Sequence, residues 1–294
     1  MPTLRCGTFF SPLNHMLSSP GPQLCWITGA GGLIGHALVE SPYRPHRWQP
    51  RGLTRPELDL TNFREVEHAF LRESPQAILH CAALSKSPAC QADPSLAWQL
   101  NVAVTQHLAA LAQGIPFFFF STDLVFDGQR GRYVESDPTN PLSVYGTTKL
   151  AAEQVVLANP RHTVLRTSLN HGTSPTGDRG FNEETLNTWR SGRTTRLFVD
   201  EFRSPIPAAA TARATWELLD ASATGLFHVA GAERLSRWEI GQHLAQQNPA
   251  ITARLEAASL REYIGAPRPP DTSLNSSRAQ SLLSFRLPEY RKST

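Results

Sequence analysis

Short apolar runs alternate along this chain with longer segments in which apolar side chains recur every three or four positions. The runs are Leu24–Thr28, Trp48–Leu53, Ala77–Cys81, Phe117–Ser121 and Thr163–Thr167. They are typical of strands, and Phe117–Ser121 is so apolar that both of its faces must be covered. The segments between them with helical spacing are 32–40, 61–73, 94–113 and 144–158. This alternation predicts right-handed crossovers and an α/β fold with a doubly wound parallel sheet.

The pattern becomes less regular after residue 168. Glycine, proline and polar residues dominate 170–180, and we expect a boundary there. The later predicted elements are a helix at 209–220, a strand at 225–229 and a helix at 236–247. The expected division is a disordered N-terminal extension, 1–22; a main domain, 23–168, to which 203–230 return; and a smaller interleaved C-terminal lobe, 169–202 and 231–294.

The composition indicates a folded chain with a sizeable core, because 40% of the 294 residues are apolar and 18% are charged. The formal net charge of +3 is too small to indicate a nucleic acid or an anionic membrane as a partner. No apolar run approaches the ~18 residues of a membrane-spanning helix. Four cysteines, Cys6, Cys25, Cys81 and Cys90, form no CxxC pair and have no metal-ligand spacing. We therefore expect reduced thiols, no metal site and a cytoplasmic protein.

A glycine-rich loop stands directly between the first predicted strand and the first predicted helix. Gly29, Gly32 and Gly35 follow the spacing G-x-x-G-x-x-G. Gly29 would make the tight turn, Gly32 would let the backbone approach a pyrophosphate, and Gly35 would let the helix pack on the sheet. The loop predicts dinucleotide binding by a Rossmann-type domain, while a turn used only for packing is the alternative.

Two arginines stand at the end of the second predicted strand and just after it, where dinucleotide-binding domains often carry an acidic residue for the ribose. Arg51 and Arg55 flank Thr54 in this chain. A guanidinium there suits a 2′-phosphate, so we expect NADP(H) as the preferred cofactor and NAD(H) as the alternative. The other interpretation of these arginines is a solvated surface.

Tyr145 and Lys149 are four residues apart on a predicted helix, so both side chains lie on one face, one turn apart. An ammonium near a phenol favours the phenolate and lowers the phenol pKa from its usual ~10. The phenol can then exchange a proton near neutral pH. Thr122 and Asp123 end the fourth strand, at the edge of the sheet where ligands bind; strand-end capping is the alternative role for them.

These segments and several others resemble one known family. The matching phrases are Gly29–Gly35, Leu58–Thr61, Ile78–Ala83, Ser121–Gly128, Pro141–Leu150 and Leu165–Ser168. The chain is similar to the extended short-chain dehydrogenase/reductases, above all to the dTDP-4-dehydrorhamnose reductase branch, from about Leu24 to Leu283. The resemblance implies an NAD(P)-binding Rossmann domain and a substrate-binding lobe. It also implies reduction of a keto group on a nucleotide-linked sugar, with hydride from the nicotinamide and a proton from Tyr145.

The resemblance also assigns roles to individual residues. The catalytic residues would be Thr122, Tyr145 and Lys149. The residues that bind the cofactor, with Arg55 added from the argument above, would be Gly29, Gly31, Gly32, Leu33, Ile34, Gly35, Arg55, Asp59, Leu60, Ala83, Leu84, Ser85, Tyr145 and Lys149. The residues that bind substrate would be Thr122, Asp123, Leu169 and Arg203.

Two departures from the branch bear on the substrate. Leu169 stands where these reductases typically have a tryptophan against the sugar, and Asp200–Ile206 differs from their Asp-Gln turn. Within that turn, Arg203 is either a partner for a nucleotide diphosphate or a structural surface residue.

Other functions and assemblies remain as alternatives. The regulatory beta subunit of methionine adenosyltransferase resembles the same branch, which suggests a non-catalytic cofactor-binding protein. A nucleotide-sugar epimerase or dehydratase is the third hypothesis, since Asp123 stands where a dehydratase carries an acid. A homodimer is a hypothesis by analogy of fold. His80, on a buried strand, is expected to be a core histidine with satisfied hydrogen bonds.

Overall fold

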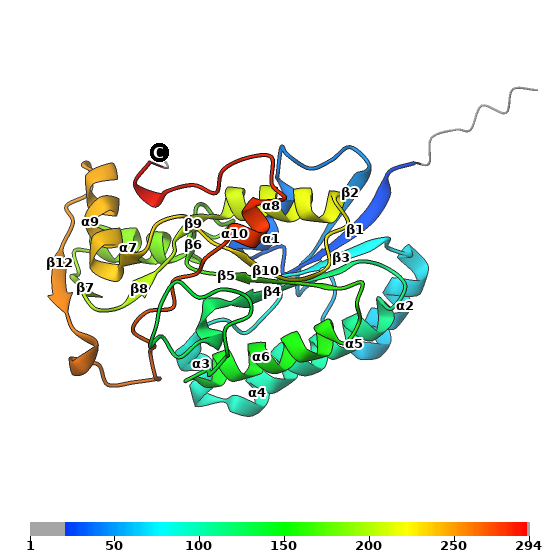
Figure 1. The fold of residues 1–294 in the computed structure, drawn as a ribbon, viewed down its shortest axis with the longest axis horizontal. Helices are drawn as coiled ribbons and strands as arrows, with labels where there is room; N and C mark the ends of the chain where they lie inside the picture. Colours follow the sequence, from blue (N-terminus) through cyan, green and yellow to red (C-terminus); the bar gives the residue numbers. More distant parts are fainter. Residues whose placement is uncertain (1–20, 293–294) are drawn as a thin grey trace, which may run out of the picture.

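A six-stranded parallel sheet forms the centre of the protein in the computed structural model, which describes residues 21–292 (Figure 1). The strand order is β10-β5-β4-β3-β1-β2. The bounds are β1 Gln23–Thr28, β2 Trp48–Leu53, β3 Ala77–His80, β4 Phe117–Thr122, β5 Thr163–Thr167 and β10 Gly225–Val229. The predicted α/β class and parallel sheet are confirmed. The expected N-terminal extension, as far as residue 20, lies outside the described residues.

Helices cover both faces of the sheet. The bounds of the long ones are α1 Leu33–Val39 and α8 Ala208–Asp220 on one face, and α2 Phe63–Glu73, α5 Val104–Leu111 and α6 Val144–Leu157 on the other (Figure 1). Along β4, Phe118 and Phe120 pack in the cluster that contains Trp216 of α8. Phe117 and Phe119 pack in the opposite cluster. Successive side chains of a strand point to opposite faces, which explains why β4 is apolar throughout.

The long helix predicted for 94–113 is confirmed from Pro94 to Leu111, but it contains a π-helical turn and is preceded by a further short helix. The segments are α3 Ser87–Ala92, which the sequence did not reveal, α4 Pro94–Trp98, a π-helical turn η1 Gln99–Ala103, and α5, which ends at Leu111 before Gly114. Asn101 of η1 is buried; its Oδ1 accepts from the Leu84 N–H at 2.8 Å and its Nδ2 donates to Thr148 Oγ1 at 3.0 Å. The π turn thus holds the loop after β3 against α6.

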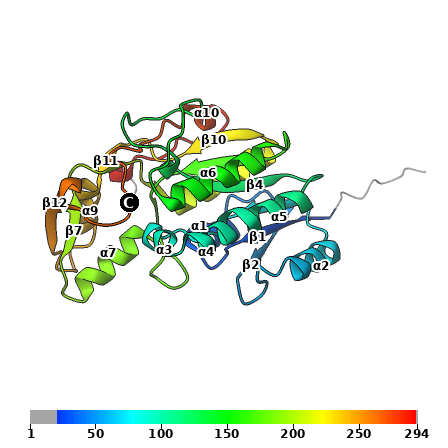
Figure 2. The ribbon, with the colours of Figure 1, turned by 90° about the horizontal axis from the view of Figure 1, so that it is seen from below.

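Most of the remaining elements gather beyond the carboxyl ends of the sheet strands, at the left of Figure 1 and again in Figure 2. Their bounds are α7 Phe181–Arg190, α9 Arg237–Gln247 and the paired short strands β6 Asn170–His171 with β9 Ile206–Pro207, β7 Thr195–Phe198 with β12 Leu255–Ala258, and β8 Phe202–Arg203 with β11 Leu235–Ser236. The short helix α10 Ser277–Gln280 lies apart from them, beside β10 (Figure 1). The sequence did not predict helix α7. Its buried residues are Glu183, Thr185 and Trp189, so apolar side chains do not recur at helical spacing along it.

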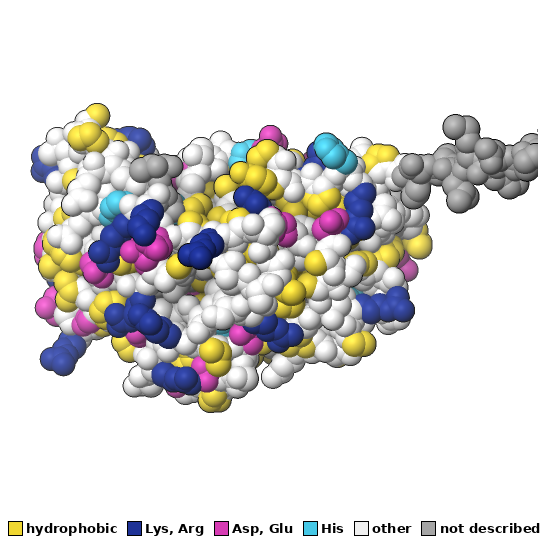
Figure 3. Space-filling view, turned by 45° about the horizontal axis from the view of Figure 1, so that its top comes forward, with side chains coloured by type: hydrophobic (Ala, Val, Ile, Leu, Met, Phe, Trp, Pro, Cys, Tyr) yellow, Lys and Arg dark blue, Asp and Glu magenta, His cyan; other side chains and the backbone are white. Residues whose placement is uncertain are grey.

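The surface carries charges of both signs. Figure 3 shows basic and acidic side chains interspersed over the face in view. Within residues 21–292, no helix has the length and hydrophobicity that crossing a bilayer requires.

Candidate functional site

One cavity of about 950 Å³ opens at the carboxyl ends of the sheet strands, at the upper end of the ~300–1,000 Å³ typical of ligand sites. It brings together every residue that the sequence analysis assigned to the site. These lining residues are Gly29, Gly31, Gly32, Leu33, Ile34, Gly35, Arg55, Asp59, Leu60, Ala83, Leu84, Ser85, Thr122, Asp123, Tyr145, Lys149, Leu169 and Arg203. Below, this space is called the reaction cavity.

The glycine loop needs its glycines for steric reasons. Gly29 has φ +69°, and a Cβ there would lie 2.7 Å from the backbone nitrogen of Ala82. A Cβ on Gly35 would lie 2.3 Å from the Gly29 carbonyl oxygen. Gly35 therefore lets α1, which packs on the sheet beside β1 and β2, come close to the loop at the end of β1. A side chain at either position would push the loop out of place.

The start of α1 leaves backbone donors facing the reaction cavity. Its N-cap is Gly32, which has no side chain to accept from the first turn. The first N–H groups of a helix have no partner within the helix, and Leu33 and Ile34, which begin α1, line the cavity. By contrast, Ser143 caps α6 by accepting from the Gly146 N–H at 3.2 Å. The loop residues fit the pyrophosphate of a dinucleotide, which needs such donors and close approach.

The two arginines near the end of β2, Arg51 within the strand and Arg55 after it, differ in availability. Arg51 Nη1 lies 2.9 Å from Glu57 Oε1, and Glu57 Oε2 also accepts from the N–H and hydroxyl of Thr54. Hydrogen bonds from Thr54 and then from Arg51 lower the pKa of Glu57 to about 2. Arg55 lines the reaction cavity with its side chain 81% exposed, 3.8 Å from Asp59. Arg55 is therefore the arginine that a cofactor phosphate can reach.

Thr122, Tyr145 and Lys149 lie together on the wall formed by β4 and α6. A Cβ on Gly146 would lie 2.3 Å from the Leu124 carbonyl oxygen, so this glycine lets α6 approach the end of β4. The sequence analysis missed Gly146, although its place between Tyr145 and Lys149 was a usable signal. The close approach brings the Thr122 hydroxyl near enough to the Tyr145 hydroxyl to lower its pKa in part.

Burial changes the protonation of both residues on α6. It raises the pKa of the Tyr145 hydroxyl, the Asp123 carboxylate raises it further, and the nearby Thr122 hydroxyl lowers it in part. The lowering of the Tyr145 pKa that the sequence predicted from Lys149 is therefore wrong for the protein without cofactor, where this pKa is raised. Burial also lowers the pKa of Lys149 from 10.5 to about 7, and Nζ lies 3.8 Å from the centre of the Phe119 ring.

Lys149→Met is expected to raise the Tm of the protein without cofactor by several degrees at pH 7. The folded chain disfavours the charged ammonium, so the wild type gains stability as pH rises from about 7 to 10.5. The advantage of the variant should therefore shrink as pH approaches 10. Thermal unfolding at a series of pH values measures the difference in Tm between the variant and the wild type. Lys292→Met, at a side chain 76% exposed, is the control and should change little; a lower Tm for Lys149→Met would contradict the burial argument.

Asp123 is held by four groups at the substrate end of the cavity. Its carboxylate accepts from the hydroxyls of Thr122 at 3.1 Å, Ser168 at 2.8 Å and Thr272 at 2.9 Å. Arg203 Nε lies 3.6 Å from the same carboxylate. Sequence reasoning missed Ser168 and Thr272, because nothing in the local pattern links residues so far apart.

A buried cluster of charges stands behind Asp123. Glu201 is fully buried and pairs with Arg203 at 3.0 Å, Arg237 at 2.9 Å and Arg268 at 2.7 Å. Burial alone would raise the pKa of Glu201, but the three guanidinium groups outweigh it and lower this pKa. Arg203 is 3% exposed, so the expectation of a surface residue is wrong: it is a buried arginine that also lines the cavity.

The other sequence expectations concern histidine and cysteine. His80 is buried, with Nδ1 2.7 Å from Thr28 Oγ1 and Nε2 3.0 Å from Thr105 Oγ1, which confirms a satisfied core histidine. In the described part of the chain, Cys25, Cys81 and Cys90 are unpaired. No group of three or more His, Cys, Asp and Glu side chains among residues 21–292 is arranged to hold a metal ion.

Comparison with known proteins gives a consistent set of relatives. The family model described as "RmlD substrate binding domain" matches residues 24–294. The probable low-salt glycan biosynthesis reductase Agl14 of Haloferax volcanii is 32% identical, covering 75% of this chain and 79% of its own. A dTDP-4-dehydrorhamnose reductase of Sinorhizobium fredii is 30% identical over 91% and 94%. The methionine adenosyltransferase 2 subunit beta of Bos taurus is 29% identical over 87% and 81%.

Solved structures agree with this family. The dTDP-4-dehydrorhamnose reductase of Clostridium acetobutylicum superposes with a TM-score of 0.84 at 25% identity, covering 92% of this chain and 96% of its own. The dTDP-4-dehydrorhamnose reductase of Bacillus anthracis, in complex with NADP, has a TM-score of 0.85 at 24% identity over 92% and 96%. Because the Bacillus anthracis structure is only 24% identical, its likeness to this chain shows the fold alone.

Proposed function

The chain belongs to the RmlD substrate binding domain family, and from that membership we propose that it is an NAD(P)-dependent reductase of the short-chain dehydrogenase/reductase type. It reduces a keto group on a nucleotide-linked sugar. The observation that carries the proposal is that Thr122, Tyr145 and Lys149 line the same cavity as the glycine loop. Reduction of a ketone needs hydride from the cofactor and a proton from a donor group, both within reach of the same carbonyl group. A shared cavity for the glycine loop and Tyr145 supports such an arrangement.

Each residue of the proposed centre has a defined task. The bound nicotinamide supplies the hydride. Tyr145 gives the proton to the ketone oxygen, and Thr122 hydrogen-bonds Tyr145 and the substrate oxygen. Lys149 holds a ribose hydroxyl and, when charged, favours loss of the Tyr145 proton. Water exclusion in this buried corner strengthens these polar interactions.

The substrate end of the cavity supports a nucleotide diphosphate. Arg179 and Arg237 line it together with Phe181, and neither guanidinium is fully buried: the side chains are 52% and 13% exposed. Guanidinium groups recognise phosphate oxygens by paired hydrogen bonds. Leu169 stands where the resembling reductases typically have a tryptophan against the sugar, so the proposal names a nucleotide-linked sugar as the substrate class and no particular sugar.

Arg55→Ala is expected to weaken NADP(H) binding about tenfold and to leave NAD(H) binding nearly unchanged. Loss of one charge-assisted hydrogen bond to an exposed phosphate corresponds to ~1.4 kcal/mol. Fluorescence titration with both reduced cofactors measures the ratio. Arg72→Ala, at another exposed arginine, is the control. Equal weakening for both cofactors would refute the proposed NADP(H) preference.

Turnover is the direct test of the proposed function. The purified chain is mixed with NADPH or NADH and a panel of 4-keto nucleotide sugars, and absorbance at the nicotinamide band is followed. We expect oxidation of the cofactor with at least one of them, faster with NADPH. Binding of cofactor and nucleotide sugar without oxidation of either cofactor would count against a reductase.

Two other functions give different outcomes. The likeness to the methionine adenosyltransferase 2 subunit beta favours a cofactor-binding regulatory subunit, which would copurify with a stoichiometric partner and turn over no sugar. A dehydratase would need Asp123 to act on a substrate proton, but Arg203 and three hydroxyls already hold this carboxylate. An epimerase would retain tightly bound oxidised cofactor through purification. We also propose that the chain divides into a main domain and a smaller lobe, that the protein is cytoplasmic, and that it forms a homodimer.

A further inference from the structure

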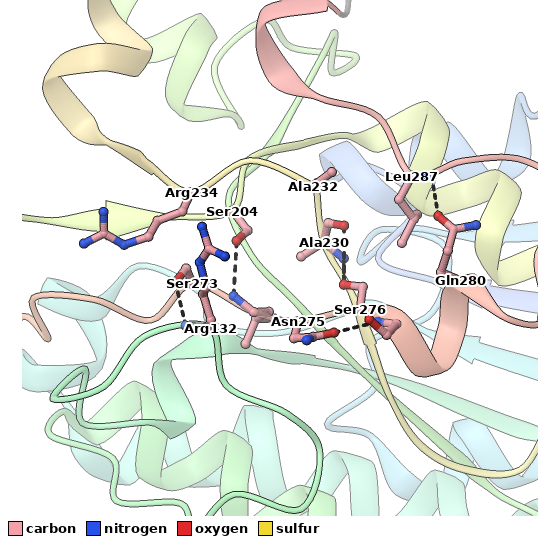
Figure 4. A pocket seen from close by; sticks show the side chains of 13 residues that line it. Arg132, Ser204, Ala230, Ala232, Arg234, Ser273, Asn275, Ser276, Gln280 and Leu287 are labelled. Carbon is pink, nitrogen blue, oxygen red and sulfur yellow. Dashed lines mark hydrogen bonds between the residues drawn. The ribbon is translucent and has the colours of Figure 1, made fainter.

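A second cavity of about 270 Å³ lies behind the substrate end of the reaction cavity (Figure 4). Two segments form a wall between them, with neighbouring residues on opposite sides. Arg203 faces the reaction cavity and Ser204 the second one. Thr272 bonds Asp123 of the reaction cavity, while Ser273 lines the second cavity. The two cavities are therefore separate chambers.

The lining of the second cavity offers hydrogen-bond donors and no carboxylate among the described residues. Ser204 Oγ accepts from the Leu274 N–H at 3.1 Å, which leaves its own hydrogen to donate. Asn275 Oδ1 accepts from the Ser277 N–H at 2.9 Å, which fixes the orientation of the amide group and leaves the Nδ2 hydrogens to donate. A donor-rich, acid-free lining matches a ligand with several acceptor oxygens.

Arg132, an exposed residue, brings a positive charge to this lining. Within residues 21–292, no ion pair or hydrogen bond engages its guanidinium, which lies on the side of the cavity formed by Ser204 and Arg234 (Figure 4). Arg234 differs, because its guanidinium pairs with Asp271 at 2.6 Å and covers the Phe202 ring.

The backbone holds Arg132 in an unfavourable conformation. Its φ is +48°, a left-handed value that only two other non-glycine residues adopt in the described chain. The Arg132 N–H donates to Ser273 Oγ at 2.8 Å, and the next N–H, of Tyr133, donates to the Ser273 carbonyl at 2.9 Å. Such strain persists where surrounding contacts impose it, and it is often found at ligand clamps.

From these observations we propose that the second cavity binds a small phosphate-bearing ligand, with Arg132 as its charged partner. The planar guanidinium fork matches two phosphate oxygens, and Ser204 and Asn275 donate to the remaining ones. The volume is below that of drug-sized sites, so it accommodates inorganic phosphate or a small phosphate monoester, not a dinucleotide.

The test is a titration that locates the bound phosphate. The full chain is saturated with NADPH, so that the glycine loop is occupied. Inorganic phosphate or glycerol 3-phosphate is then added at constant ionic strength, and backbone amide signals are followed by NMR. We expect saturable shifts at Ser204, Gly231 and Asn275. Tighter binding of the ester identifies a phosphorylated metabolite as the ligand class, and equal or weaker binding identifies free phosphate.

Two variants make the result specific. Arg132→Gly removes the guanidinium, while glycine accepts the positive φ, so the fold should be kept and the Kd for phosphate raised at least tenfold. Arg130→Gln removes the neighbouring exposed arginine and should leave the Kd unchanged. Unchanged binding by Arg132→Gly, shifts confined to the reaction cavity, or no saturation would overturn the proposal. None of these readouts depends on reductase activity.

Discussion

Tyr145→Phe is expected to lower kcat about 10³-fold while NADPH binds within about twofold of the wild-type affinity. The change removes one oxygen, the atom that gives the proton to the substrate in the proposed reaction, and general acid catalysis contributes roughly 10²–10⁴-fold. The ring still fills its place between the end of β4 and the reaction cavity. Steady-state oxidation of NADPH and fluorescence titration of the cofactor measure the two quantities separately.

The control for this variant is Tyr43→Phe. Tyr43 is 52% exposed and lies under the guanidinium of Arg213, away from the lining of the reaction cavity. Its phenylalanine variant should keep both kcat and cofactor affinity. If Tyr145→Phe retained more than a tenth of wild-type kcat, another group would have to supply the proton, and the assignment of Tyr145 would fail.

Glu201→Gln is expected to lower the free energy of unfolding by about 3–5 kcal/mol at pH 7. The glutamine has the same shape but no charge, and it leaves three guanidinium groups around a neutral amide in the interior. Removing one partner of a buried ion cluster costs about this much, because the remaining charges stay desolvated. Urea unfolding followed by circular dichroism measures the difference from wild type.

The effect of Glu201→Gln should depend on pH in a definite direction. The folded-state pKa of Glu201 is lowered, so its contribution is fully present above the ordinary glutamate pKa of ~4.3 and is lost as pH falls through the folded value. The gap between the variant and the wild type should therefore narrow in acid. Glu256→Gln, at an exposed ion pair with Arg196, is the matched control and should cost at most ~1 kcal/mol. A loss that small for Glu201→Gln would contradict a stabilising role for the cluster.

Sequence reasoning worked best where the signal is local. The strand at Trp48–Leu53 and the strand at Gly225–Val229 have the predicted bounds, because a short apolar run between turns is visible without knowledge of its partners. The helix predicted for 94–113 runs from Pro94 to Leu111, but the π turn at Gln99–Ala103 was not visible in the sequence because it serves a contact of Asn101 with Leu84, 17 residues away. The short strand Thr195–Phe198 was missed because it pairs with Leu255–Ala258, some 60 residues further on.

The sequence by itself determined the parallel α/β architecture, because strands and helices alternate along the chain. It also determined the glycine loop and the helical spacing of Tyr145 and Lys149, because both depend on residues a few positions apart. Only the tertiary structure decided which charges are free and which are already paired. Arg203 and Arg55 look alike in the chain, yet one is buried against Glu201 and Asp123 and the other is open to solvent. The reason is that pairing depends on contacts such as that of Thr272 with Asp123, which join residues 149 positions apart and leave no local pattern.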